Sequence, residues 1–380
     1  MNNSKKKNTA DWIIISSDEP WSDVWMPQVH YAFQLSKRYD VVFIDPPNRW
    51  TFKNLFNFKL ETRKVDNDII VVRYLNLIPL SLGRVAVYLN DKINQFLISK
   101  LLNFKKNQLK IIMWRFDAFR SMYNFENRET TRQIFHVIDP IAGKNLDIPL
   151  AKRAELVLIT SPKFIDHYLK INSNVLQIGQ GVDLDFYRSP VQYNEKEIEQ
   201  SKNSILLLCT YTDEIDYEFL KRLAEKFSSK NITLIGPNRV TLPPKIAQFD
   251  SLIQLKNVNW LGAMPPAKFR KHLDSCRVGL IAYDKSNSVN NLRSPLKIIG
   301  YLAAGKPVIS NIDSEVPSLV NKGIYYAYED ETFYDYIEAS YKENLQFDKH
   351  IVNDYLSKMD YDNLLDSIFE NLDEPLKAKY

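Results

Sequence analysis

Cysteine is nearly absent from this chain of 380 residues. The two cysteines, Cys209 and Cys276, lie in or beside apolar runs. Two are too few for a disulfide framework or a cysteine-rich zinc cluster. The sequence therefore indicates a protein of a reducing compartment, and we expect it to be cytoplasmic.

Long apolar runs are also missing. No uncharged apolar stretch approaches the roughly 18 residues that a membrane span needs. The first ten residues are polar, include Lys5, Lys6 and Lys7, and lack the apolar core of a signal peptide. We expect a soluble protein that attaches at most to the inner face of a membrane.

Glycine is sparse, and none of the ten glycines belongs to a glycine-rich cofactor loop. This argues against a methyltransferase, although Asp45, Pro46 and Pro47 imitate the Asp-Pro-Pro motif with which amino-methyltransferases grip an exocyclic amine. Asp-x-Asp triplets such as Asp183 to Asp185 are common by chance. We therefore predict no metal site and no bound cofactor.

Charge is distributed unevenly around a formal net charge of +4. Residues 51–128 contain 14 Lys/Arg and 6 Asp/Glu, whereas residues 328–374 contain 3 and 14. The basic, aromatic-rich stretch 96–120 fits contact with an anionic membrane, where each Lys or Arg contributes about 1 kcal/mol. It fits a solvated helix face followed by a buried strand equally well. We do not expect nucleic-acid binding, a lesser alternative.

Apolar strand-like runs alternate with segments of helical period, which is the pattern of parallel sheets covered by helices on both faces. One series runs from Trp12 to Ile178 and a second from Ser204 to Ser310. The sequence predicts an α/β protein with two doubly wound, parallel-sheet domains facing a cleft. The expected divisions are a first domain at 1–180, a second domain at 181–360, and a C-terminal helix at 361–380 that packs back on the first domain.

One segment, Arg293-Ser294-Pro295-Leu296-Lys297, has the features of an anion-binding helix start. Ser294 suits the N-cap and Pro295 the first helical position. The unpaired N–H groups and the dipole at a helix start attract a diphosphate, and Arg293 and Lys297 add positive charge. An ordinary capped helix between two strands is the simpler interpretation.

Several spaced segments favour the anion-binding interpretation, because they resemble one family. The matching pieces are 204–216, 235–237, 259–262, 278–283 and 294–310, with weaker matches at 181–186, 21–35 and 137–140. They are similar to bacterial GT-B glycosyltransferases that build capsule, teichuronic acid and other surface polysaccharides. The resemblance implies a GT-B fold of two Rossmann-like domains and metal-independent transfer of a sugar from a nucleotide-diphosphate donor to a glycan or lipid-linked acceptor.

The resemblance also implies a donor site in the second domain. Arg293, Ser294 and Lys297 would hold the diphosphate, and Gly262 and Tyr283 would border the donor. The retaining branch of the family carries a Glu-x7-Glu pattern, but this chain has Leu292 and Gly300 at those positions. Glu315 or Asp313, on the loop after the next strand, are conceivable substitutes for holding the ribose.

The catalytic base is expected on a loop of the first domain, because an inverting transfer needs a group that takes the acceptor proton. Asp139 is the first candidate, since related inverting enzymes carry an Asp in a similar strand-end segment. It also fits an Asp that caps the turn before Pro140. His30 is the second candidate, and Asp18, Glu19 and Asp45 also follow strands or loops.

Two functions of other classes stay open. The missing carboxylates fit a non-catalytic GT-B-like protein that binds a glycan or partner. The same fold also serves nucleotide-sugar epimerases, which form product without an acceptor.

Overall fold

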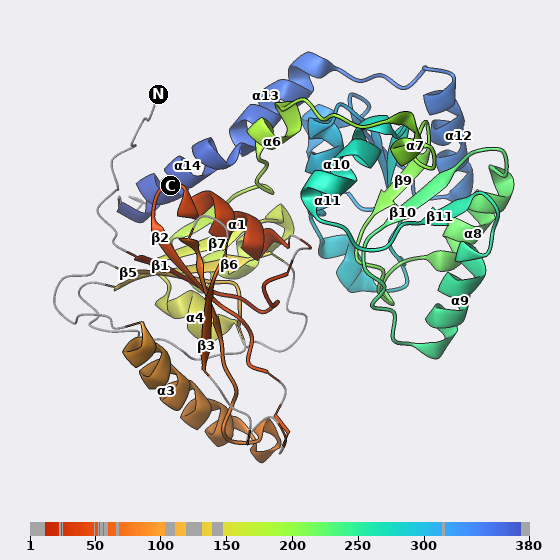
Figure 1. Cartoon of the computed structure of the whole chain (residues 1–380). Coiled ribbons are helices and arrows are strands. Elements are labelled where there is room, and N and C mark those ends of the chain that lie inside the picture. The colour runs from red at the N-terminus through yellow and green to blue at the C-terminus, as the bar shows by residue number, and fades with distance from the viewer. Residues whose placement is uncertain are drawn as a thin grey trace. The chain divides into compact units, whose positions relative to one another are not determined.

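The computed structural model describes residues 12–22, 24, 26–48, 50, 51, 53, 56, 60–65, 68–102, 111–118, 131–138, 147–313 and 316–373. The chain divides into two compact units, Met1–Gln177 with Ile368–Tyr380 and Ile178–Ser367 (Figure 1). Each unit has its own sheet and its own apolar core.

The sheet of the first unit has eight strands within the described residues, in the order β3-β4-β2-β1-β5-β6-β7-β8. Every neighbouring pair is parallel except β3 with β4, which is antiparallel. The strands are β1 Trp12–Ser16, β2 Asp40–Ile44, β3 Glu61–Lys64, β4 Ile70–Arg73, β5 Ile111–Arg115, β6 Thr131–Val137, β7 Leu156–Ile159 and β8 Val175–Gln177.

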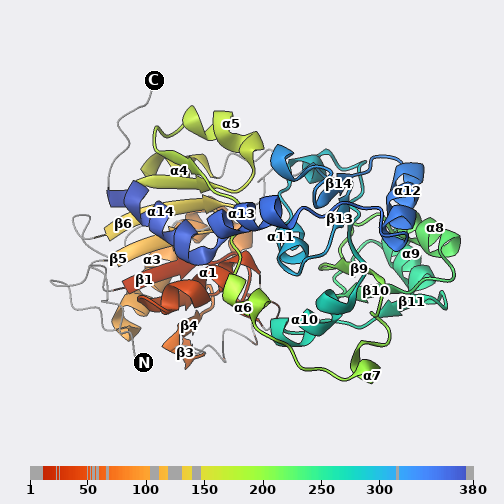
Figure 2. The same ribbon diagram turned by 90° about the horizontal axis from the view of Figure 1, so that it is seen from above.

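Helices cover the central strands of this sheet, which are apolar on both faces. Ile13, Ile14 and Ile15 are completely buried. The helices are α1 Pro27–Ser36, η2 Leu80–Leu82, α3 Arg84–Leu101, α4 Ile148–Arg153, η3 Pro162–Phe164, α5 Ile165–Leu169 and the end of α14 Tyr361–Asp373. Figure 2 shows the last turns of α14 beside α1, where Phe369 contacts Tyr39 with ring centroids 5.2 Å apart.

The sheet of the second unit is fully parallel, in the order β11-β10-β9-β12-β13-β14. The strands are β9 Ile205–Leu208, β10 Ile232–Ile235, β11 Val258–Trp260, β12 Val278–Ile281, β13 Val308–Ser310 and β14 Ile324–Tyr326. The helices are α6 Leu184–Arg188, α7 Glu195–Ile198, α8 Tyr217–Lys226, α9 Pro243–Ile253, α10 Pro266–Ser275, η4 Ser288–Leu292, α11 Leu296–Ala303, η5 Pro317–Leu319, α12 Asp330–Tyr341, α13 Lys349–Met359 and the start of α14.

Tyr301 of α11 ties its helix to the middle of this sheet. Its hydroxyl donates to the carbonyl of Leu206 at 2.8 Å and accepts from the N–H of Leu208 at 2.9 Å. Gly279 of β12 makes room for the ring, because a Cβ there would lie 2.4 Å from Tyr301. The completely buried ring and its two hydrogen bonds therefore fix α11 against β9.

The predicted fold class is confirmed, and two of the strands were not predicted. The edge strand β3 is antiparallel and was not predicted, since Glu61–Lys64 is exposed and carries no apolar signal. The short strand β14, which lies before the acidic tail, was not predicted either. The compact units divide after Gln177, and the first unit resumes at Ile368; the boundaries expected from the sequence were 180 and 361.

Within the described residues, every helix is too short or too polar to span a bilayer.

Replacing Tyr301 by Phe removes a hydroxyl that serves two buried backbone groups. Leaving such groups unpaired costs about 1–3 kcal/mol. We expect the free energy of unfolding of the second unit to fall by that amount. Urea denaturation followed by circular dichroism measures it. Tyr328→Phe is the control, because the Tyr328 side chain is exposed. Equal stability of the two variants would contradict the anchoring role.

Candidate functional site

The topology of the second sheet fixes where a ligand is expected. The chain passes from β9 outward to β10 and β11, and then returns to the other side of β9 as β12. Ligands of open parallel sheets lie beyond the carboxyl ends of the strands at such a reversal. The loops after β9 and β12, residues 209–216 and 282–295, are therefore the candidate site.

Tyr283 lies at the centre of this site with two cations against it. The Lys297 ammonium donates to the Tyr283 hydroxyl at 3.2 Å and lies 5.3 Å from the ring centroid. The Arg293 guanidinium lies 5.4 Å from the same centroid. The structure thus brings together three of the residues that the sequence assigned to the donor.

Asn311, in the loop after β13, fixes the backbone of Tyr283. Its side-chain oxygen accepts from the Tyr283 N–H at 3.0 Å, and its amide donates to the Tyr283 carbonyl at 2.6 Å. Nothing in the sequence pattern separated Asn311 from other loop residues, so the sequence interpretation missed it.

Arg293 has protein partners of its own. Its guanidinium pairs with the Glu214 carboxylate at 2.5 Å and donates to the Asn290 side chain at 3.0 Å. Glu214 belongs to the loop after β9 and was not among the predicted site residues. Its pairing with Arg293 joins segments far apart in the sequence, and the local pattern around Asp213 and Glu214 carried no signal of it. A bound diphosphate would compete with Glu214 for Arg293.

The start of α11 differs from the sequence prediction. Pro295, and not Ser294, is the N-cap, and the helix begins at Leu296. The Ser294 carbonyl instead accepts from the Gln180 amide at 2.7 Å. The helix ends before Gly305, which has φ +70°, and the Lys306 N–H donates to the Tyr301 carbonyl at 2.9 Å. This is the hydrogen bonding that closes a helix on a left-handed glycine.

Lys297 is charged at neutral pH. Burial lowers the pKa of its ammonium, but the Tyr283 hydroxyl and the Cys209 thiol outweigh this, and the net pKa lies above its ordinary value. Burial also raises the pKa of Cys209 to about 11, against the opposing effect of Lys297.

Gly300, where related enzymes carry the ribose carboxylate, is covered by another side chain. A Cβ at this position would lie 2.9 Å from the hydroxyl of Tyr187 in α6. Tyr187 is held by Arg270, whose guanidinium lies 5.2 Å from its ring and donates to its carbonyl at 2.5 Å. An aromatic side chain thus occupies the space beside this turn of α11.

Two glycines bring neighbouring loops together. Gly262, after β11, has φ +71° and accepts through its carbonyl from the Gly236 N–H at 2.9 Å. Gly236 has φ +139°, and a Cβ on it would lie 1.7 Å from the Cys209 carbonyl oxygen. Only glycine fits where the loops after β9 and β10 meet, which the sequence interpretation did not single out.

Two of the predicted site residues, Glu315 and Asp139, lie outside the described residues. His30 is half-buried in the first turn of α1. Asp45 is buried, accepts from the Trp21 N–H at 2.8 Å and pairs with Arg73 at 3.1 Å. Asp45 therefore joins the loop after β1 to strand β4.

Asp18 lies at the equivalent reversal of the first sheet, between β1 and β5. Its carboxylate accepts from the Gln28 amide at 2.6 Å. The side chain is accessible to solvent, but surrounding protein removes part of its hydration. This partial burial, followed by the charge of Asp117, raises the pKa of Asp18 to about 6. A carboxylate with such a pKa can accept a proton at neutral pH.

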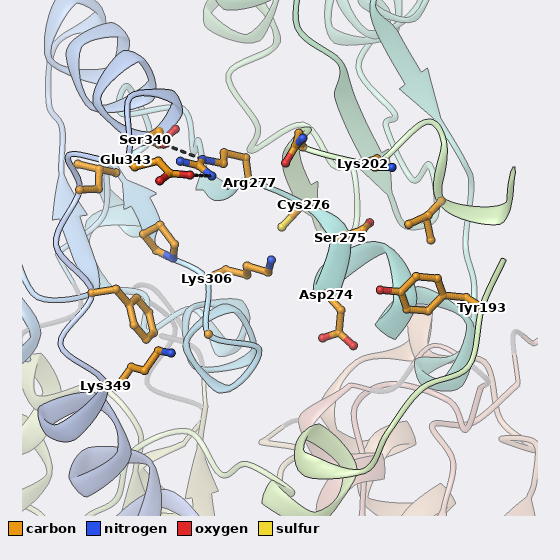
Figure 3. A pocket seen from close by; sticks show the side chains of 16 residues that line it. Tyr193, Lys202, Asp274, Ser275, Cys276, Arg277, Lys306, Ser340, Glu343 and Lys349 are labelled. Carbon is orange, nitrogen blue, oxygen red and sulfur yellow. Dashed lines mark hydrogen bonds and ion pairs between the residues drawn. The ribbon is translucent and has the colours of Figure 1, made fainter. Parts of the chain in front are cut away.

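A separate cavity of about 810 Å³ lies at the opposite, amino-terminal edge of the second sheet (Figure 3). Lys306 and Lys349 extend toward it in Figure 3. Helices α10, α11 and α12 end beside it, and Arg277 donates to the Ser340 carbonyl at 2.6 Å. Positive side chains stabilise such helix ends. The basic lining therefore has a structural reason, and this cavity is distinct from the site around Tyr283.

Solved structures of low sequence identity match almost the whole chain. An α-glucosyltransferase in complex with UDP superposes with a TM-score of 0.61 at 11% identity, over 96% of this chain and 100% of that chain. The catalytic domain of starch synthase IV from Arabidopsis thaliana, bound to ADP and acarbose, gives 0.59 at 11% identity, over 96% and 98%. The chain has the GT-B glycosyltransferase fold.

A sequence relative agrees with this fold. The chain is 24% identical, over 192 residues, to a protein of Bacillus subtilis (strain 168) named as a teichuronic acid biosynthesis glycosyltransferase, TuaH. The match covers 49% of this chain and 47% of that protein, so it spans about half the length of the relative. No protein-family model matches the chain. The resemblance to bacterial GT-B glycosyltransferases is confirmed.

The GT-B fold alone does not define the reaction. A Listeria monocytogenes protein named as a UDP-N-acetylglucosamine 2-epimerase superposes with a TM-score of 0.52 at 10% identity, over 95% of this chain and 97% of that chain. Only the residues of the site and the products formed distinguish sugar transfer from epimerisation of the donor.

Replacing Asp117 by Asn removes a negative charge near Asp18. Because that charge raises the pKa of Asp18, the variant should titrate Asp18 at a lower pH than the wild type does. Carboxyl-detected NMR measures both titrations. Glu19→Gln is the matched control, since Glu19 is a weaker contributor and should shift the midpoint less. A wild-type midpoint near the ordinary value of about 3.9 would contradict the assignment.

Proposed function

We propose that the chain is a metal-independent glycosyltransferase that moves a sugar from a nucleotide-diphosphate donor to a glycan or lipid-linked acceptor in surface-polysaccharide synthesis. The observation that carries the proposal is the pair of cations, Arg293 and Lys297, against Tyr283 at the reversal of the second sheet. The GT-B fold and the relative named as a glycosyltransferase support it.

The reaction exchanges one bond for another at the anomeric carbon of the sugar. The bond to the donor diphosphate breaks, the acceptor hydroxyl oxygen forms the new bond, and its proton passes to a base. The leaving diphosphate gains negative charge as the bond breaks. Lys297 stabilises this charge most directly, because Arg293 also has Glu214 to neutralise.

The other donor contacts follow from the same location. Ser294 precedes the N-cap of α11, and Gly262 and Tyr283 border the donor from the loops after β11 and β12. Glu315 is the proposed carboxylate for the ribose, because Gly300 has none. No metal and no cofactor takes part in the proposed reaction, in which the nucleotide sugar is a substrate.

The location and partners complete the proposal. A cytoplasmic protein at the inner face of the membrane would meet both a soluble nucleotide sugar and a lipid-linked acceptor. The basic segment 51–128 would contact the anionic lipids there. No nucleic-acid partner is part of the proposal.

Replacing Lys297 by Met should lower kcat/KM for donor consumption by about 100-fold, as loss of one preorganised charge at a leaving group does. Release of nucleoside diphosphate from the donor measures it, after a thermal-shift panel of nucleotide sugars has identified that donor. Lys306→Met is the matched control, because Lys306 lies at the opposite edge of the same sheet. Undiminished turnover by the Lys297 variant would exclude the role.

The base of the reaction is proposed to be Asp139, with His30 as second candidate. Asp139→Asn should reduce kcat by about 100-fold or more while donor binding stays unchanged, since general base catalysis contributes about 10²–10⁴-fold. Asp18→Asn is the comparison. The base is Asp18 and not Asp139 if only the Asp18 variant loses activity and the pH dependence of wild-type kcat shows an apparent pKa near 6.

Two alternative functions remain, and each has its own experimental result. The Glu214–Arg293 pair and the Tyr187 cover over Gly300 suit a protein that binds without catalysis. Calorimetric binding of a nucleotide sugar with no turnover on any acceptor preparation would favour that function. Conversion of the donor to an epimer without acceptor would favour an epimerase.

A further inference from the structure

Helix α3 of the first unit has its polar side buried and its apolar side exposed. The residues that it buries are Ala86, Asn90, Asp91, Asn94 and Ile98, and three of these five are polar. An ordinary surface helix does the reverse. Figure 1 shows α3 at the lower margin of the unit.

Hydrogen bonds explain why the polar side faces inward. The Asn90 side chain accepts from the Ile78 N–H at 2.9 Å and donates to the Ile78 carbonyl at 2.7 Å. The Asn94 amide donates to the Asn76 side chain at 3.0 Å. The helix cannot roll to bury its apolar side without breaking these three bonds and leaving buried groups unpaired.

The outward side carries several exposed apolar side chains. Val85 is 69% exposed and Phe96 67%, and Tyr88 and Leu89 lie between them on the same side of the helix. Half of the exposed large apolar residues in the described part of the chain fall between residues 80 and 101. These seven are Leu80, Leu82, Val85, Tyr88, Leu89, Phe96 and Leu101. Single exposed apolar residues are normal, whereas a concentration marks an interaction surface.

The charges on this surface have one sign. Arg84, Lys92 and Lys100 are exposed, and the single acid of the helix, Asp91, is buried on the other side. Lys92 and Lys100 flank Phe96 on the apolar stripe, four residues away in either direction. Apolar and aromatic side chains bordered by lysines suit a helix that lies in the interface of an anionic bilayer.

We propose that the exposed side of α3, with η2 before it, docks on a membrane that contains anionic lipid. The helix lies parallel to the surface, with Val85, Leu89 and Phe96 at the boundary of the acyl chains and Lys92 and Lys100 among the phosphates. The buried Asn90 and Asn94 keep it attached to the unit, so α3 does not cross the bilayer. The surface holds the enzyme where a lipid-linked acceptor would be.

Vesicle flotation of the full chain tests this surface. Binding to vesicles of phosphatidylcholine with 30% phosphatidylglycerol should exceed binding to phosphatidylcholine alone by at least tenfold. The double variant Val85→Ser/Phe96→Ser should lose at least tenfold in partition coefficient. Lys92→Gln/Lys100→Gln should lose about fivefold for each lysine at low salt, and less at high salt.

Leu242→Ser/Ile246→Ser is the matched control, because it removes two exposed apolar side chains from the α9 region of the other unit. It should partition as the wild type does, and all variants should keep their melting temperature. Absence of wild-type binding to anionic vesicles, or unchanged binding of Val85→Ser/Phe96→Ser, would overturn the proposal. The proposal would also be overturned if sedimentation velocity showed a wild-type dimer and a monomeric Val85→Ser/Phe96→Ser variant. The exposed side of α3 would then join two copies of the chain. No sugar donor is used, so the result is independent of the proposed transfer reaction.

Discussion

The contact on which the candidate site depends is the Tyr301 hydroxyl between the two backbone groups of β9. It fixes α11 relative to the central strand of the second sheet, and α11 carries Lys297. Gly279 is required for the same contact, because only a residue without a side chain leaves space for the ring. The start of α11 therefore lies at the reversal of strand order, where the loops after β9 and β12 meet.

Charge compensation is the second feature of this site. Arg293 is neutralised by Glu214, whereas the nearest polar partner of Lys297 within the described residues is the neutral Tyr283 hydroxyl. The positive charge available to a diphosphate is thus concentrated on Lys297. Because of this asymmetry, substitution of Lys297 tests the proposed reaction more directly than substitution of Arg293. Glu214 reduces the positive charge that Arg293 offers to a diphosphate.

The fold could be predicted from the sequence because both sheets consist of buried, uninterrupted apolar strands separated by helices. The run Ile13 to Ile15 and the run Ile205 to Leu207 need no long-range information to be identified as strands. Two strands, β3 and β14, could not be predicted in this way. The exposed β3 lacks an apolar pattern, and the three-residue β14 is held by its place beside β13.

The candidate site was predicted in part. Arg293, Lys297 and Tyr283 came from a local motif and its resemblance to a family, and the structure brings them together. Glu214, Asn311 and Tyr187 could not be found, because their roles arise from contacts between segments far apart in the sequence. The α3 surface was predicted only as positive charge, since the inward turn of Asn90 and Asn94 depends on tertiary hydrogen bonds.

The most direct test of the candidate site is a crystal structure of the full chain with the nucleoside diphosphate of its donor. We expect the diphosphate beyond the carboxyl ends of β9 and β12, with an oxygen about 2.7–3.2 Å from the Lys297 ammonium. A diphosphate bound instead in the cavity beside Lys306 and Lys349, at the amino-terminal edge of the sheet, would contradict it.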